Sequence, residues 1–204
     1  MTNIQNTAMV GSADQRFDQA LQRGLFTVDS DTSAASTRGN LELRDMSFYV
    51  KKEVTGMGNN VDLLLSTDAF VQGQINIERE ELKKGTLFLC ESVLIKYSGA
   101  VDSATVDDPL KVTDWKTAAK DVHPSVREGK LEIWQSGKKV AVIEASRCFY
   151  NTDQEGYQLQ VPIALSGGSK LMFRYEFAKP IPTTADKKYY VSVELNGIGT
   201  EITG

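Results

Sequence analysis

The sequence predicts an all-β fold, an antiparallel β-sandwich or barrel, and three observations lead to this prediction. In the last third of the chain, short apolar runs alternate with glycine- and proline-containing turns. No period of 20–50 residues repeats, which argues against solenoids and propellers. The expected strands do not alternate with long helices, which argues against a parallel α/β sheet. In this last third of the chain, strands are expected at residues 157–165, 170–177 and 188–197.

Residues 1–40 are expected to form an N-terminal arm, and residues 41–204 the β-sandwich domain. The arm is rich in Asn, Thr, Ser, Ala and Asp, and segment 29–39 has too few apolar residues to pack. One short helix is expected in the arm, with Ser12 as its N-cap and Gly24 at its end. Such an arm either stays loose or docks on a neighbouring molecule. The apolar groups expected to make that contact are Phe17, Leu21, Leu25 and Phe26.

Strand signals begin at Leu41. The apolar residues Leu41 and Leu43 share one parity, whereas Met46, Phe48 and Val50 share the other. This change predicts a bulge or a corner at Arg44-Asp45. Further strand-like runs lie at residues 61–65, 74–77 and 86–97.

A second short helix is expected at residues 114–122, because Trp115, Ala118, Ala119 and Val122 follow helical spacing and Pro124 would stop the helix. The segments 131–134 and 139–143 flank Gln135-Ser-Gly-Lys138, which predicts a β-hairpin. The whole chain then contains about eight to ten strands and two short helices. The last strand, Tyr189 to Leu195, is expected to be central and buried on at least one face.

Composition excludes several classes of protein. The formal net charge of −4 argues against binding nucleic acid through a basic surface. The first residues lack the basic and apolar regions of a signal peptide, and no apolar run reaches the ~20 residues that a membrane-spanning helix needs. Cys90 and Cys148 lie in separate apolar, strand-like runs, which indicates two buried thiols and synthesis in a reducing compartment.

The chemistry-bearing residues do not form the pattern of an enzyme or of a cofactor site. His123 is the only histidine and stands outside any nucleophile or zinc-ligand motif. No cofactor and no metal are therefore expected. A calcium site at Asp102, Asp107 and Asp108 is disfavoured, because their spacing matches no calcium-binding loop. The candidate carboxylates for glycoside hydrolysis, expected instead to point to solvent, are Glu132, Glu176 and Glu194.

Four segments carry a resemblance to a known class of protein. They are the strand end Ile95-Lys-Tyr-Ser-Gly99, the hairpin on Gln135-Ser-Gly-Lys138, the strand Val161-Pro-Ile-Ala-Leu165 and the closing strand at 190–198. From about residue 82 to 203, the order of these signals resembles the jelly-roll virion proteins of tailless icosahedral bacteriophages. The resemblance implies a single jelly roll, because 204 residues are too few for the two stacked jelly rolls of the major capsid proteins.

The function that the resemblance implies is that of a structural virion protein. The chain would be a capsid component, not an enzyme, that is made in the host cytoplasm. It would self-assemble as a homo-oligomer through its sandwich and arm, with other virion proteins as further partners. An alternative is a carbohydrate- or ligand-binding β-sandwich with a platform of exposed aromatic rings, at Trp134 and Tyr157 or at Trp115 and Trp134. A third interpretation is an enzyme on a jelly-roll scaffold, such as a glycosidase or a cupin-like oxygenase. The cupin branch is weak, because a cupin needs several metal-binding histidines and the chain has one.

Overall fold

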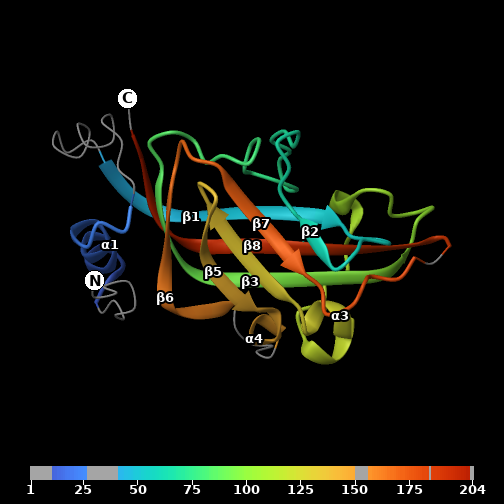
Figure 1. Ribbon diagram of the computed structural model, residues 1–204. Coiled ribbons are helices and arrows are strands. Elements are labelled where there is room, and N and C mark those ends of the chain that lie inside the picture. The colour runs from blue at the N-terminus through green and yellow to red at the C-terminus, as the bar shows by residue number, and fades with distance from the viewer. Residues whose placement is uncertain (1–10, 27–40, 150–155, 184, 203–204) are drawn as a thin grey trace.

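Eight strands form two four-stranded antiparallel sheets that pack face to face, which confirms the predicted fold class (Figure 1). The computed structural model describes residues 11–26, 41–149, 156–183 and 185–202. Sheet A has the strand order β1 (Leu41–Glu53), β8 (Lys187–Ile202), β3 (Leu87–Asp102) and β6 (Tyr157–Ser166). Sheet B has the order β2 (Asn60–Asp62), β7 (Leu171–Glu176), β4 (Lys130–Gln135) and β5 (Lys138–Glu144).

The pairing of the strands is that of a jelly roll. The first strand, β1, pairs with the last, β8, and the pairs β2–β7, β3–β6 and β4–β5 follow inward along the chain. The strands therefore pair as in one long antiparallel hairpin, with the pairs β1–β8 and β3–β6 in sheet A and the pairs β2–β7 and β4–β5 in sheet B. The predicted turn at Ser136-Gly137 closes the innermost pair, β4–β5, with both residues at positive φ.

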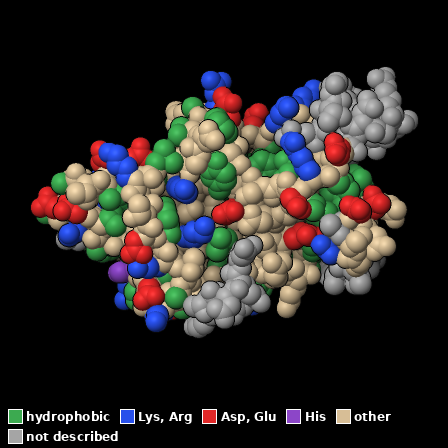
Figure 2. All heavy atoms as spheres, turned by 180° about the vertical axis from the view of Figure 1, so that it is seen from behind, with side chains coloured by type: hydrophobic (Ala, Val, Ile, Leu, Met, Phe, Trp, Pro, Cys, Tyr) green, Lys and Arg blue, Asp and Glu red, His purple; other side chains and the backbone are tan. Residues whose placement is uncertain are grey.

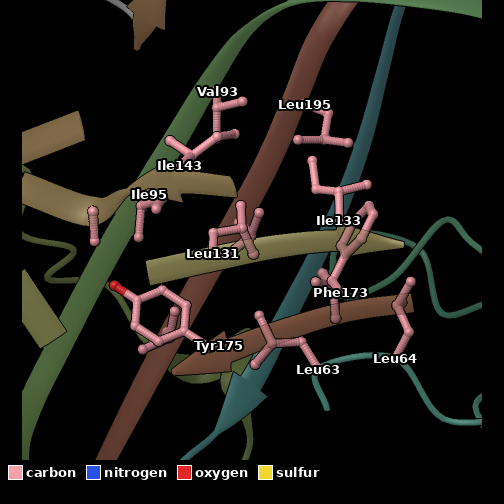
Figure 3. Packing of buried hydrophobic residues seen from close by; sticks show 14 of the residues in the cluster. Leu63, Leu64, Val93, Ile95, Leu131, Ile133, Ile143, Phe173, Tyr175 and Leu195 are labelled. Atoms are coloured by element: carbon pink, nitrogen blue, oxygen red, sulfur yellow. The ribbon is translucent and has the colours of Figure 1, made fainter. Parts of the chain in front are cut away.

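The core lies between the two sheets (Figure 3). Strands β4 and β7 of sheet B direct alternate apolar side chains toward β3 and β8 of sheet A. The fully buried residues among them include Leu131, Ile133, Phe173, Tyr175, Val93, Ile95 and Leu195. Strand β8 lies between β1 and β3, and residues 190–193 are buried on both faces of the sheet. The prediction of a central, buried closing strand is confirmed.

The arm contains the expected helix, α1 (Ala13–Gln22). Ser12 caps it through a reciprocal pair of hydrogen bonds with Gln15, a capping box. The chain leaves the helix through Gly24, whose φ of 64° suits glycine at a helix end. In Figure 1, α1 lies at one end of the sandwich, beside the start of β1 and the end of β8. Residues 1–10 and 27–40 lie outside the described part of the chain.

The predicted bulge at Arg44-Asp45 is wrong. Strand β1 pairs with β8 in one uninterrupted register, from Leu41 opposite Ile202 to Glu53 opposite Tyr190. The apolar residues change from odd to even positions because α1 covers the outer face at the start of the strand, whereas sheet B covers the inner face further along. Early in the strand, Leu43 points outward, toward α1, whereas Phe48 and Val50 point inward, toward sheet B.

The predicted helix at 114–122 is also wrong. Lys116 instead forms two backbone hydrogen bonds with Tyr97 of β3, of 3.0 and 2.7 Å, and a single 3-10 turn, η3, follows at Ala119–Asp121. Pro124 does not stop a helix but starts one, α3 (Pro124–Arg127), because proline is pre-organised for a first helical position. A further 3-10 turn, η2, spans Pro109–Lys111.

Three other strand assignments change. Cys148 lies in the short helix α4 (Ala145–Phe149), where Ala145, Cys148 and Phe149 face the core at helical spacing. The run at 61–65 contributes only the three-residue strand β2. The run at 74–77 forms no strand, but a single bridge joins Ile75 to Val50 of β1.

Candidate interaction surfaces

The arm docks on the outer face of sheet A of its own chain. Phe17 and Phe26 are 2% and 6% exposed, and their ring centroids lie 5.1 Å apart. Leu21 and Leu25 are half-buried against the same cluster. The residues of sheet A beneath them are Leu87, Leu89 and Ile198, with Leu43 and Ala164 at the margin. The structure therefore brings together the four residues predicted to contact a neighbour, and they contact their own sheet; their role between molecules stays a prediction.

An ion pair fixes the orientation of α1. The guanidinium of Arg16 donates from Nε to Oε1 of Glu91 at 2.5 Å and from Nη2 to Oε2 at 3.0 Å. This fork-to-fork geometry is more directional than a single contact. Glu91 stands on β3 next to the polar remainder of the same face, so α1 covers only one end of sheet A.

Beyond α1, the outer face of sheet A is a shallow polar hollow. Its volume is about 460 Å³, and Ser92, Gln158 and Asn196 contribute to its lining. A neighbouring hollow shares these three residues and continues to Lys96 and Glu194, whose Nζ and Oε2 atoms lie 3.7 Å apart. Figure 2, which views the molecule from behind, shows positive and negative side chains interspersed over the described surface. This face offers amide, hydroxyl and paired charged groups to a ligand.

The aromatic rings considered for sugar stacking do not form a common platform. Trp134 belongs to sheet B and Tyr157 to sheet A. Lys139 Nζ lies 5.0 Å from the ring centroid of Trp134, and Arg147 lies 5.9 Å from that of Tyr157. Arg147 also donates a 3.0 Å hydrogen bond to the Tyr157 hydroxyl. Cations of the protein itself therefore occupy positions that a stacking sugar would need.

The outer face of sheet B carries a ladder of alternating charges across its strands. Arg174 of β7 makes two hydrogen bonds to Asp62 of β2, of 2.8 and 3.2 Å, and stands opposite Glu132 of β4 in the strand register. Glu132 in turn accepts hydrogen bonds from Lys139 and from the indole of Trp134. These contacts, the Lys139 hydrogen bond foremost, lower the pKa of Glu132. Glu132 is thus held ionised, which suits a structural carboxylate and not a general acid.

The other carboxylates do not converge. Glu194 contributes to the hollow on sheet A, on the opposite side of the sandwich from Glu132, so the two form no pair across a groove. Glu176 is exposed at the end of β7.

The candidate calcium ligands are engaged in local contacts. Asp102 accepts from the backbone of Ala104, and Asp108 caps η2. Asp107 pairs with Lys111. Within the described ranges, no three His, Cys, Asp or Glu residues gather as metal ligands would.

The histidine and the thiols have structural surroundings. His123 accepts a 3.2 Å hydrogen bond from the Ser125 backbone and caps α3. Cys90 and Cys148 are buried and not joined to each other, which confirms the prediction of two buried thiols. Burial raises the pKa of the Cys148 thiol to about 12 and that of Cys90 further, so both thiols are protonated at neutral pH.

The sequence reasoning missed an apolar groove between β5 and β6, the facing edge strands of the two sheets. The groove has a volume of about 450 Å³. Val140 and Val142 line one side, together with Lys138 and Lys139, and Leu159, Val161 and Pro162 line the other. Val140 and Val142 are 42% and 49% exposed. The signal in the sequence was the run of apolar residues at consecutive positions 140–143, which one buried face of a strand does not require.

No protein-family model matches the chain, and no curated protein matches it either. In the part of the chain that the structure describes, no helix has the length and apolar character needed to cross a membrane.

Proposed function

We propose that this chain is a structural virion protein, a capsid component that assembles with copies of itself and with other proteins of the particle. The observation that carries the proposal is the order of the strands, β1-β8-β3-β6 in one sheet and β2-β7-β4-β5 in the other. This two-sheet jelly roll is the architecture of viral capsid domains, of lectins and of cupins. Since one fold serves several functions, the surfaces must distinguish among them.

The surfaces favour assembly over catalysis. The histidine caps a helix, and the thiols are buried and protonated. A cupin-like metal site would need several histidines, and the chain has one. The exposed valines of the groove between β5 and β6 are a feature of a contact surface. Buried, unpaired thiols agree with synthesis in a host cytoplasm and with residence in a particle assembled there.

A size measurement tests this proposal. Purified full-length protein is examined by sedimentation velocity over a range of concentrations and by negative-stain electron microscopy. A capsid component is expected to give dimers or larger assemblies whose proportion increases with protein concentration. A chain that sediments as a monomer at every concentration, and that is never found with particles from its source, would refute the proposal.

The second candidate function is a ligand-binding module, and the polar hollow on sheet A favours it. Ser92, Gln158 and Asn196 present hydroxyl and amide groups of the kind that bind sugar hydroxyls. A glycan array tests this candidate directly, with Gln158→Ala as the variant that should lose any signal. Trp134→Ala serves as the comparison, because its ring is covered by Lys139. An array without hits removes this candidate and leaves the assembly proposal in place.

A further inference from the structure

The large apolar side chains that are exposed in the described residues fall into two groups. One group, Val140 and Val142, belongs to the groove between β5 and β6. The other group lies on the loop at residues 65–75, between β2 and β3, or beside it, and consists of Leu65, Phe70, Val71 and Leu110. Phe70 is the most exposed of them all, at 56%. Apolar side chains scattered singly are ordinary, but a group of them marks a contact site.

Backbone hydrogen bonds hold the loop against the free edge of β1. Val71 and Ile75 exchange two of these bonds, of 3.0 and 2.9 Å, and Lys51 of β1 donates to the carbonyl of Gln74 at 2.8 Å. The tip of the loop, at residues 69–72, is exposed. Because the loop is anchored on both sides of this turn, Phe70 is presented to a partner with little ordering cost on binding.

The loop and the groove lie at opposite edges of the sandwich. The loop follows β1, which ends sheet A on one side. The groove lies between β6, which ends sheet A on the other side, and β5, which ends sheet B. Two copies that meet edge to edge therefore bring one loop to one groove, and each copy keeps a free loop or a free groove for the next. Such a contact is heterologous, head to tail.

The loop and the groove also complement each other in charge. Lys138 lines the groove, and no carboxylate of the described residues pairs with it. On the other edge, the Arg79 backbone donates to the carbonyl of Asp68 at 2.9 Å, which places the turn of Glu78 and Glu81 beside the loop. Both glutamates are exposed, and the contact of Glu78 with Arg79 is a long one of 3.8 Å. These carboxylates are able to pair with a lysine of another molecule.

We propose that the loop at residues 65–75 of one copy docks in the β5–β6 groove of the next copy, with Phe70 between the apolar walls of the groove. The groove has a volume of about 450 Å³, and an apolar cavity of about 150 Å³ already holds a benzene ring, so the groove has room for the Phe70 ring. Repetition of this head-to-tail contact closes a ring or builds a filament. The inference rests on the self-assembly in the proposed function and names the two surfaces that meet.

Sedimentation velocity of full-length variants tests the contact from both sides. Phe70→Ala removes the docking ring, and Val140→Asp places a charge in the groove; each is expected to weaken association at least roughly tenfold. Phe70→Leu keeps an apolar side chain at the tip and should retain most of the association. Gln72→Ala is the matched control, because it changes another exposed side chain of the same loop and should have no effect. All four side chains are exposed, so thermal unfolding should match that of the wild type.

A mixture of Phe70→Ala with Val140→Asp provides a sharper test. The first variant keeps an intact groove, and the second keeps an intact loop. Together they are expected to form a one-to-one pair that grows no further, although each variant alone stays dissociated. A mixture that stays as dissociated as its components would overturn the proposal.

The charges are tested separately at low salt. Lys138→Glu places a carboxylate near the glutamates of the neighbouring copy and is expected to weaken association about threefold. The double variant Lys138→Glu/Glu78→Lys exchanges the charges and should recover the loss. Lys120→Glu, at another exposed lysine, is the control and should change nothing. A double variant weaker than Lys138→Glu alone would contradict this pairing.

The outcomes separate the two proposals. A wild-type chain that never associates overturns both the loop–groove contact and the proposed function. A wild-type chain that associates, and does so equally well with Phe70→Ala, overturns only the loop–groove contact; this holds also if Val140→Asp alone is impaired, since the groove then takes a different partner. Loss in both variants with recovery of a pair in their mixture supports head-to-tail docking.

Discussion

Replacing Phe17 with alanine is expected to release α1 from sheet A while the sandwich stays folded. Phe17 is 2% exposed, and the only other buried residue on the described part of the helix is Ala20. Truncating a buried phenylalanine to alanine costs about 3–5 kcal/mol. The Arg16–Glu91 ion pair is 26% and 21% exposed at its two side chains, and such a pair contributes about 1 kcal/mol at most.

These magnitudes decide the outcome. A helix of 10 residues does not hold its structure alone in water, so α1 is helical only while it is docked. Losing about 3 kcal/mol of docking energy shifts the docking equilibrium more than roughly a hundredfold toward the released arm. The strands of the sandwich keep their own core, from which Phe17 is absent. The effect should therefore be local.

Hydrogen–deuterium exchange of wild-type, Phe17→Ala and Asp18→Ala proteins measures this effect. Amides of residues 13–22 should exchange rapidly in Phe17→Ala and at the wild-type rate in Asp18→Ala, whose changed side chain is exposed on the same helix. Amides of β8 should stay protected in all three proteins. Unchanged protection of α1 in Phe17→Ala, or equal loss of protection in β8, would refute the reasoning.

Three further predictions concern a buried tyrosine, a carboxylate on the outer face of sheet B and a buried thiol. Tyr175→Phe removes the 2.8 Å hydrogen bond from the tyrosine hydroxyl to the carbonyl of Val126. Because that carbonyl still accepts a hydrogen bond from the Gly129 backbone, the free energy of unfolding, measured in urea, should fall by only about 1 kcal/mol. A fall of more than about 3 kcal/mol would contradict this account. Because the pKa of Glu132 is lowered in the folded state, its stabilising effect is present above the unfolded pKa and is lost as pH falls through the folded one. The stability difference between wild type and Glu132→Gln should thus shrink from about pH 7 to about pH 3, and a constant difference would exclude a charge effect. With burial raising its pKa to about 12, the Cys148 thiol should react with a thiol reagent only after unfolding, and rapid reaction of the native protein would show that this site opens.

The local signals in the sequence were reliable where neighbours along the chain supply the interaction. The Ser12 cap and the Ser136-Gly137 turn require contacts only within a few residues, and the structure contains both. The central, buried position expected for Tyr189 to Leu195 is confirmed. Its apolar residues are all buried: Tyr189, Tyr190, Val191, Val193 and Leu195.

Signals that depend on distant partners were misread. In the sequence of β1, the shift of apolar residues from odd to even positions resembles a bulge. The structure explains the shift without a bulge, because Leu43 packs outward against the cluster of α1. Residues 114–122 have helical spacing, but the backbone of Lys116 pairs with Tyr97 of β3 instead. A strand edge offers hydrogen bonds that a short amphipathic helix cannot match with propensity alone.

The candidate interface was predictable only in part. The apolar residues of the arm were identified, but composition does not say whether they dock on their own sheet or on another molecule. The β5–β6 groove depends on which strands end the two sheets, and this follows from topology and not from any local motif. The sequence also does not show that Lys139 lies 5.0 Å from the centroid of the Trp134 ring, because the bulge in the hairpin brings the two residues opposite each other.

The nested pairing of the strands has a consequence for how the chain folds during its synthesis. The innermost pair, β4–β5, is joined by a two-residue turn and can form early. Strand β1 cannot pair with β8 until β8, which lies much later in the sequence, has been synthesised. Because β8 also lies between β1 and β3, sheet A lacks a central strand until residues 187–202 have left the ribosome. Contacts of such long sequence separation make folding slow and leave strand edges exposed in the nascent chain. Any fragment that ends before β8 therefore lacks a whole sheet A.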